Sequence, residues 1–371
     1  MAGPPLFVVF NLASGRGDRE EVRREIESAC AAQGRQAELL TVDAPDRLME
    51  TAHEAVRRAQ KAGGIVVAAG GDGTLSAVAQ ATLGSGCAYG VLPRGTFNYF
   101  SRTHGISADI REAMKTLLEE TPQPVQVGLV NGRAFLVNAS VGLYPQLLED
   151  RESWKQQFGR SRLVALGAGI ATLLKGHRSL RLHFDAPDAP QAPRDLRTPT
   201  LFVGNNALQM EQVGLPESRA IDRGELAGVA LRPVGRWALL GLLLQGALGR
   251  LGEADELVDF SFKHMTVRAR RFGTRRVKVA TDGEIVWMQL PLTFEVAPEP
   301  LMLVRPRGLA PERAAQQQGA QEASQQGLDA PRGLPPQNPQ GSTLTSPSAH
   351  SAPSSASSLA SPQPATEGPP P

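Results

Sequence analysis

The chain contains little cysteine, and this shortage excludes a disulfide-stabilised scaffold. Only Cys30 and Cys87 occur among the 371 residues, and their spacing fits neither a metal site nor a disulfide framework. Hydrophobic residues still make up 41% of the chain, which is enough for an ordinary buried core. We therefore expect each cysteine to fill a core position in a reducing compartment.

The chain also lacks a large net charge and a long apolar run. A net charge of +2 gives no argument for a nucleic-acid partner. No apolar run is long enough to span a membrane, and we expect no transmembrane segment. Residues Met1–Pro5 have no basic region, and Leu6–Phe10 is too short for the apolar core of a signal peptide. These observations predict a cytoplasmic protein.

The hydrophobic pattern divides the chain into three parts. Apolar strands alternate with amphipathic helices over residues 1–123, which predicts an α/β domain with a buried parallel sheet. Short strands dominate residues 124–305, where Asn131-Gly132 is a strong hairpin signal, so we expect a β-rich second domain. Residues 306–371 hold 13 of the 29 prolines amid Gln, Ser and Ala, which predicts a disordered tail.

A glycine-rich turn follows the apolar run Ile65–Ala69. The turn Gly70-Gly71-Asp72-Gly73-Thr74 leads into a helical pattern, so it lies between a strand and a helix N-terminus. Backbone N–H groups in such a turn can bind a phosphate, because glycine lets the ligand approach the backbone closely. A carboxylate would repel phosphate, so Asp72 suits a metal ion, a hydroxyl proton or the loop itself. The combination indicates phosphoryl transfer, although an ordinary strand-to-helix corner is the simpler alternative.

Two further loops follow predicted strands of the first domain. Asn11–Gly17 contains Ser14 and Gly15, and Gly95–Asn98 follows the strand that ends near Pro93. Ligands of open α/β sheets bind at the carboxyl ends of the strands, so we expect the three loops to meet there. Their small polar residues fit a nucleotide.

Four motifs in this order resemble the diacylglycerol kinase catalytic-domain family, which includes bacterial lipid kinases and sphingosine kinases. The motifs are Asn11 to Gly15, Gly70 to Thr74, Pro93 to Asn98 and Asp282-Gly283-Glu284, and the resemblance covers roughly residues 5–305. It implies an α/β nucleotide-binding domain like that of NAD kinases and phosphofructokinases, followed by a β-sandwich domain. ATP, used with Mg²⁺, and a lipid head group would meet between the two.

The resemblance also implies roles for particular residues. Asn11, Thr41, Thr96 and the segment Gly70 to Ser76, which includes Leu75, would contact the nucleotide. Asp282 would be the general base, with Glu284 positioning it or its metal, and Asp72 is the rival base. Chemistry requires such a group, because a lipid hydroxyl is a poor nucleophile until a carboxylate takes its proton. Without the resemblance, Asp282-Gly283 would be interpreted as a hairpin turn.

The chain departs from the family pattern in three places. Gly95-Thr96-Phe97-Asn98-Tyr99 replaces the usual Gly-Thr-Gly-Asn-Asp, and the first motif lacks the common proline. Arg223 stands where many bacterial relatives have an acidic residue of a structural Mg²⁺ loop. A cation disfavours a metal site, so we do not expect this ion to be retained.

Two segments have competing interpretations. The arginine-rich stretch from Arg268 to Lys278 is either a charged edge strand or a contact for an anionic membrane surface or for ATP. The leucine-rich segment 237–251 is either a core helix or part of a lipid pocket.

The sequence therefore predicts an ATP-dependent lipid kinase of phospholipid metabolism that touches the inner membrane surface transiently. An NAD kinase-like enzyme and a non-catalytic nucleotide- or lipid-binding module are the alternatives. The acceptor stays open among diacylglycerol, a sphingoid base, phosphatidylglycerol and an undecaprenyl-type alcohol.

Overall fold

The computed structural model of the chain describes residues 3–12, 19–143, 179–212, 218–235, 254–269 and 276–307, with a few isolated positions between 145 and 250. These residues belong to one compact unit, Met1–Ala314. The predicted fold class is confirmed in them, because an α/β region precedes a β-rich region. The tail predicted to be disordered over residues 306–371 lies outside the described residues from residue 308 on, as does most of segment 237–251. The segment Val164–Lys175, whose Gly, Ala and Leu content predicts a helix, lies outside them as well.

The first sheet has six strands in the order β2-β1-β3-β4-β18-β5. Strands β2, β1, β3 and β4 are parallel, as expected of strands joined by helices. The elements of this region are β1 Leu6–Asn11, α1 Arg19–Ala32, β2 Ala37–Val42, a 3-10 turn Pro45–Arg47, α2 Leu48–Ala62, β3 Ile65–Gly70, α3 Asp72–Thr82, β4 Ala88–Pro93, α4 Tyr99–Thr103, α5 Ile110–Glu119, β5 Pro122–Val125 and β18 Leu301–Val304.

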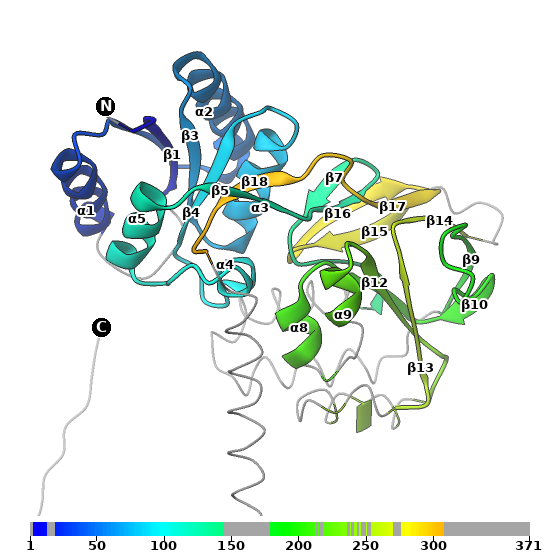
Figure 1. Ribbon diagram of the computed structural model, residues 1–371. Helices are drawn as coiled ribbons and strands as arrows, with labels where there is room; N and C mark the ends of the chain where they lie inside the picture. Colours follow the sequence, from blue (N-terminus) through cyan, green and yellow to red (C-terminus); the bar gives the residue numbers. More distant parts are fainter. Residues whose placement is uncertain are drawn as a thin grey trace, which may run out of the picture. The chain divides into compact units, whose positions relative to one another are not determined.

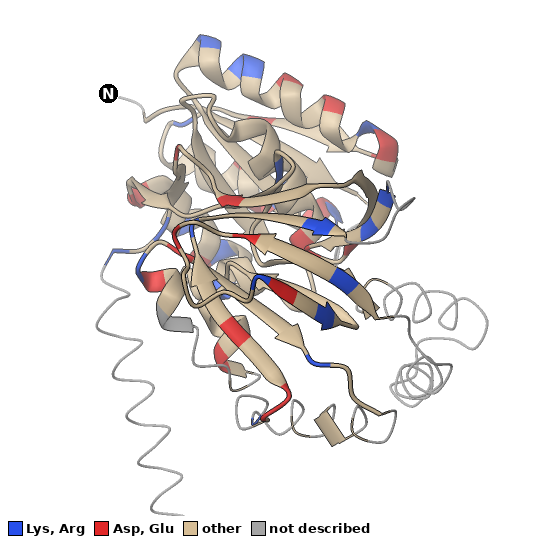
Figure 2. Cartoon of the chain, turned by 90° about the vertical axis from the view of Figure 1, so that its right-hand side faces the viewer, with Lys and Arg blue, Asp and Glu red and all other residues tan. Residues whose placement is uncertain are grey.

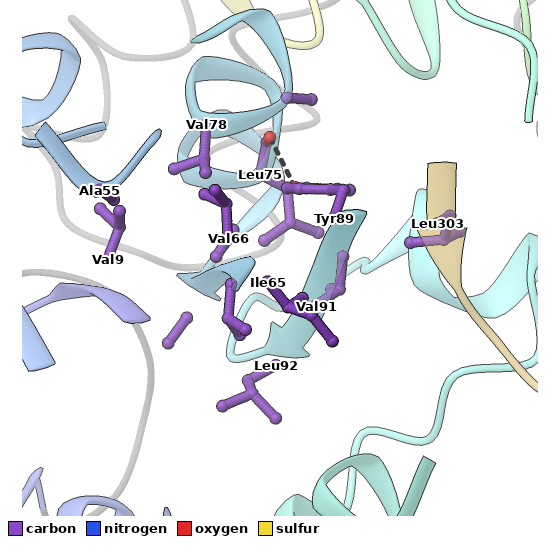
Figure 3. Packing of buried hydrophobic residues seen from close by; sticks show 14 of the residues in the cluster. Val9, Ala55, Ile65, Val66, Leu75, Val78, Tyr89, Val91, Leu92 and Leu303 are labelled. Carbon is purple, nitrogen blue, oxygen red and sulfur yellow. Dashed lines mark hydrogen bonds between the residues drawn. The ribbon is translucent and has the colours of Figure 1, made fainter. Parts of the chain in front are cut away.

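The central strands are buried on both faces. Every residue of β3 is buried, and its apolar run packs against helix α3 through Leu75 and Val78 (Figure 3). Helix α2 buries Ala52, Ala55 and Ala59 and ends at Gly63, whose φ of 62° allows the left-handed turn that closes the helix. The apolar periodicity that predicted these elements is therefore the pattern that fills the core.

The last strand returns to the first sheet. In Figure 1, β18 lies beside β4 and β5, and it pairs in parallel with β4 and antiparallel with β5. Leu301, Leu303 and Val304 on β18 are buried in the core of the first sheet. Residues near both ends of the β-rich region thus belong to the α/β sheet, and the predicted boundary at residue 123 remains a proposal.

Two antiparallel six-stranded sheets form the β-rich region, in the orders β10-β9-β14-β17-β6-β7 and β13-β12-β11-β8-β15-β16. Phenylalanines and branched residues from both sheets share one core. The predicted hairpin turn is confirmed, since Asn131 and Gly132 have φ values of 48° and 76°. The elements are β6 Gly128–Val130, β7 Arg133–Phe135, β8 Asn138–Gly142, β9 Leu180–Asp185, β10 Asp195–Thr198, β11 Thr200–Gly204, α8 Ala207–Gln212, α9 Ser218–Asp222, β12 Leu226–Leu231, β13 Leu257–Phe262, β14 His264–Ala269, β15 Arg276–Thr281, β16 Glu284–Gln289 and β17 Leu292–Val296.

Helix α2 carries both acidic and basic residues on its exposed face. Figure 2 shows residues of both charges along this helix, and Glu54 forms ion pairs with both Arg57 and Arg58. Among the described residues, no helix is long and apolar enough to cross a membrane.

Candidate active site

The three predicted loops begin at the carboxyl ends of neighbouring strands. Asn11 ends β1, and its side-chain amide donates to Thr74 Oγ1 at 2.8 Å. Arg94 follows β4, and its backbone N–H donates to the Gly70 carbonyl at the end of β3 at 2.8 Å. The structure thus brings all three strand ends together, as the sequence predicted. Ser14 and Gly15 lie outside the described residues.

Helix α3 begins inside the glycine turn. Gly71 has extended φ and ψ angles of −84° and 178° and precedes the first helical residue, Asp72. The N–H groups of the first helical turn have no partner within the helix, so they can bind an anion. Any side chain at Gly70 would collide with Thr74, because an added Cβ would lie 2.5 Å from it. The glycine therefore allows the tight turn that presents these donors.

A buried tyrosine holds the start of α3 in place. Tyr89 on β4 is fully buried, and its hydroxyl donates to the Leu75 carbonyl at 2.8 Å (Figure 3). Leu75 itself is fully buried, and its N–H already donates to the Gly71 carbonyl. Among the residues predicted to contact the nucleotide, Leu75 thus has a packing role.

Asp72 has one engaged and one unpartnered oxygen. Its Oδ2 accepts from the Asn98 N–H at 3.2 Å, whereas its Oδ1 is buried without a hydrogen-bond partner among the described residues. Burial raises the pKa of Asp72, the Asn98 hydrogen bond opposes this, and the charge of Asp282 raises the pKa further. A buried, unpaired carboxylate oxygen is unfavourable, and such exceptions occur at catalytic and ion-binding sites.

The loop after β4 folds around an asparagine. Asn98 is in the left-handed region, with φ 49°, and its side chain bonds the N–H and the carbonyl of Gly95. Gly95 packs against Gly71, since a Cβ added at Gly95 would lie 3.0 Å from the Gly71 Cα. Phe97, 50% exposed, stacks on Tyr99 with ring centroids 5.8 Å apart. The two family departures in this loop therefore form one aromatic pair, and they flank Asn98, whose N–H bonds Asp72.

Asp282 lies in the turn between β15 and β16, with φ 47°. Its Oδ1 accepts from the N–H groups of Val137 and Asn138 at 2.8 and 2.9 Å. Its Oδ2 accepts from the Leu136 N–H at 2.7 Å and from Ser76 Oγ at 2.5 Å. Burial raises the pKa of Asp282, and these hydrogen bonds oppose the rise. The turn thus links the β-rich region to helix α3.

Glu284 approaches the same helix. Its Oε2 accepts from Arg133 Nη2 at 2.8 Å, and Arg133 Nε donates to Thr281 Oγ1 at 3.0 Å. A Cβ added at Gly73 would lie 3.1 Å from Glu284 Oε1. Asp72, Asp282 and Glu284 therefore meet around the first turns of α3.

The remaining predicted contacts are more peripheral. Thr41 is an exposed residue of β2 opposite Phe10, and Thr96 is exposed in the loop after β4. Sequence reasoning did not assign site roles to Arg94 or Arg133, which the structure places beside the site residues Asn11 and Glu284. Arg94 lies within one of the four family motifs, whereas Arg133 lies outside all four, in a hairpin whose sequence gave no signal for a site.

In the stretch around Arg223, where many bacterial relatives have a structural Mg²⁺ loop, the charged side chains pair with protein groups. Arg223 Nη2 donates to Glu225 Oε2 at 3.0 Å, and Ser261 Oγ donates to the same oxygen at 2.8 Å. The described ranges contain no group of three or more His, Cys, Asp or Glu side chains arranged to hold a metal ion.

Comparisons with known proteins show which family this chain resembles. Residues 5–130 match the model of the diacylglycerol kinase catalytic domain. A lipid kinase YegS-like protein of Pseudomonas aeruginosa is 32% identical over 252 residues, covering 65% of this chain and 78% of the relative.

Two further proteins are similar. The diacylglycerol kinase of Bacillus subtilis is 33% identical over 134 residues, which cover 35% of this chain and 42% of that protein. The fold is similar to a crystal structure of a diacylglycerol kinase from Bacillus anthracis, with a TM-score of 0.58 and 18% identity over 82% of this chain and 97% of the other.

Proposed function

This chain belongs to the diacylglycerol kinase catalytic-domain family, and from this premise we propose that it transfers the γ-phosphoryl group of ATP to the hydroxyl of a lipid. The proposal rests most directly on Asp72, at the N-terminus of a helix that follows a glycine turn, because its buried Oδ1 has no hydrogen-bond partner in the part of the chain that the structure describes. A ligand or ion at this place would satisfy the carboxylate.

The residues present fit a nucleotide. The N–H groups of the first turn of α3 have no acceptor within the helix and would bind its phosphates, and the helix dipole favours their negative charge. Asn11, Thr74 and Ser76 carry polar side chains at the same edge of the sheet. Glycines at positions 70, 71 and 95 keep this edge free of bulky side chains.

Asp72 also fits a role in holding Mg²⁺. Mg²⁺ is commonly bound by one or two carboxylates, with phosphate oxygens and water completing its six ligands, so a larger acidic cluster is not required. When bound, the ion would offset negative charge on the phosphates.

We assign Asp282 as the base that takes the proton of the acceptor hydroxyl. All four acceptor directions of its carboxylate are occupied, but the bond from Ser76 can be exchanged by rotating one hydroxyl. If Ser76 turns to a phosphate, Oδ2 becomes available to the acceptor. The acceptor oxygen then bonds to the γ-phosphorus, the bond from that phosphorus to the bridging oxygen breaks, and ADP leaves with the electron pair.

Glu284 has a positioning role in this proposal, since it joins Arg133 to the first turn of α3. Phe97 and Tyr99 flank Asn98, which bonds Asp72, and their stacked rings suit the hydrocarbon part of a lipid and a transient contact with the inner surface of the membrane. The acceptor itself is left to experiment.

The test is transfer of the γ-phosphate of ATP, with Mg²⁺, to diacylglycerol, a sphingoid base, phosphatidylglycerol and an undecaprenyl-type alcohol in mixed micelles, with NAD in a parallel reaction. A phosphorylated lipid is the expected product and identifies the acceptor. Phosphorylation of NAD alone would favour an NAD kinase-like enzyme. ATP binding without transfer to any acceptor would favour a binding module.

A further inference from the structure

A guanidinium group stands at the sheet edge where the three strands end. The Arg94 side chain lies over the Phe10 ring, 4.9 Å from its centroid, and Arg94 Nη1 donates weakly to the Asn11 carbonyl at 3.5 Å. Its backbone N–H donates to the Gly70 carbonyl, so the side chain of Arg94 contacts the end of β1 and its backbone contacts the end of β3, where the glycine turn begins. No carboxylate pairs with Arg94 among the residues that the structure describes.

This arrangement is costly for a purely structural cation. Arg94 is half-buried, and both burial and repulsion from Arg19 lower its pKa. Arg19 begins α1, the helix that follows the loop Asn11–Gly17, which the sequence predicts to contact the nucleotide. Two cations close enough to repel each other are stabilised when an anion binds near both.

We propose that Arg94 binds the γ-phosphoryl group of the nucleotide and stabilises the charge on it during transfer. This inference rests on the proposed kinase function. Arg94 adjoins Gly95, which packs on Gly71 just before Asp72, so the guanidinium belongs to the reacting end of the site. Arginine suits this role because its planar fork of donors matches phosphate oxygens and stays charged at every physiological pH.

The experiment compares Arg94→Met, which keeps the stem over Phe10, with Arg94→Lys, which keeps the charge. Arg111→Met is the matched control, because Arg111 on α5 already pairs with Glu25 of α1 and its side chain is 75% exposed. Turnover and the affinities for ATP and for ADP are measured for all variants, with melting temperatures to verify folding.

We expect Arg94→Met to reduce kcat about 10²- to 10³-fold, as removal of one donor to a developing charge does elsewhere. Its affinity for ATP falls about tenfold or more, while its affinity for ADP changes less than about twofold, because ADP lacks the γ-phosphate. Arg94→Lys recovers part of the loss, and Arg111→Met resembles the unmodified protein.

Equal losses of affinity for ATP and for ADP would overturn the inference. They would mean that Arg94 binds the α- or β-phosphate or supports the fold. Unchanged turnover would overturn it as well. If the unmodified protein neither binds ATP nor phosphorylates a lipid, the proposed function itself fails, which separates the two results.

Discussion

At the scale of single residues, the site contains two buried carboxylates whose ionised forms are unfavourable. Asp72 and Asp282 are carboxylates that burial makes harder to ionise, and they repel each other. Asp282 is compensated by four hydrogen bonds, whereas Asp72 keeps one oxygen unpaired. Such sites often gain stability when a functional charge is removed.

We therefore expect Asp72→Asn to raise the melting temperature at pH 7, measured without nucleotide or Mg²⁺, while lowering activity. The folded-state pKa of Asp72 exceeds its unfolded value, so this carboxyl group contributes less stability as pH rises through that window. The advantage of the variant should hence shrink as pH falls to about 4 and below, where the aspartate is protonated. Asp109→Asn, which keeps a helix cap on the surface, serves as the control. A lower melting temperature of Asp72→Asn at pH 7 would contradict this account.

Asp282→Asn tests the base. A general base contributes about 10²- to 10⁴-fold, so turnover should fall by that range while ATP affinity is largely retained. The amide nitrogen would face a backbone N–H, and a modest loss of stability is expected as well. Full activity in this variant would instead assign the base to Asp72, whose Asn variant would then lose turnover without losing affinity for Mg²⁺ and ATP.

At the scale of elements, helix α3 connects the phosphate loop to the β-rich region. Its first turn carries Asp72, Ser76 bonds Asp282, and Gln80 accepts from the Ala134 N–H of β7 at 2.6 Å. One face of this helix therefore carries Asp72 and also contacts the β-rich region through Ser76 and Gln80. Helix α3 is less amphipathic than α2 because the residues outside its buried side are mostly small and uncharged, whereas α2 carries several charged residues opposite its buried alanines.

The substitution Gly73→Ala should affect the stability of α3 and the turnover of the enzyme in different ways. Alanine favours helix by about 0.5–1 kcal/mol, but its Cβ would come 3.1 Å from Glu284 Oε1. We expect unchanged or higher stability, with turnover reduced several-fold because Glu284 is displaced. Combining it with Glu284→Ala should add no further loss of turnover, and independent losses in the double variant would refute the contact.

At the scale of the whole molecule, the return of β18 ties the end of the β-rich region to the first sheet. Leu301 and Leu303 are at most 2% exposed, and β18 lies between β4 and β5. Strands β4 and β5 do not pair with each other, so β18 is the strand that joins β5 to the rest of the sheet.

Two shortened chains test this role. A chain ending at Arg307 should keep its melting temperature and activity, since composition predicts no core in the residues removed. A chain ending at Pro300 also loses β18, and truncating even one buried leucine to alanine commonly costs about 2–5 kcal/mol, so this chain should lose cooperative unfolding. Thermal unfolding followed by near-ultraviolet circular dichroism distinguishes them, and equal transitions would show that β18 is dispensable.

The sequence by itself determined the elements whose signals are local. Apolar runs identified β1, β3 and β4, and the glycines at 70–73 identified the turn into α3. The Asn131-Gly132 pair identified its hairpin, because two successive residues must have positive φ there. These features depend on neighbouring residues, so they can be predicted without knowledge of the rest of the chain.

Only the tertiary structure decided which distant groups meet. The partners of Asp282 are backbone N–H groups at 136–138 and a hydroxyl at 76, and no sequence pattern specifies such pairs. The return of β18, and the approach of Arg94 and Arg133 to the site, follow from sheet order and register. Chain topology and packing set these contacts, because they join residues that lie up to about two hundred positions apart.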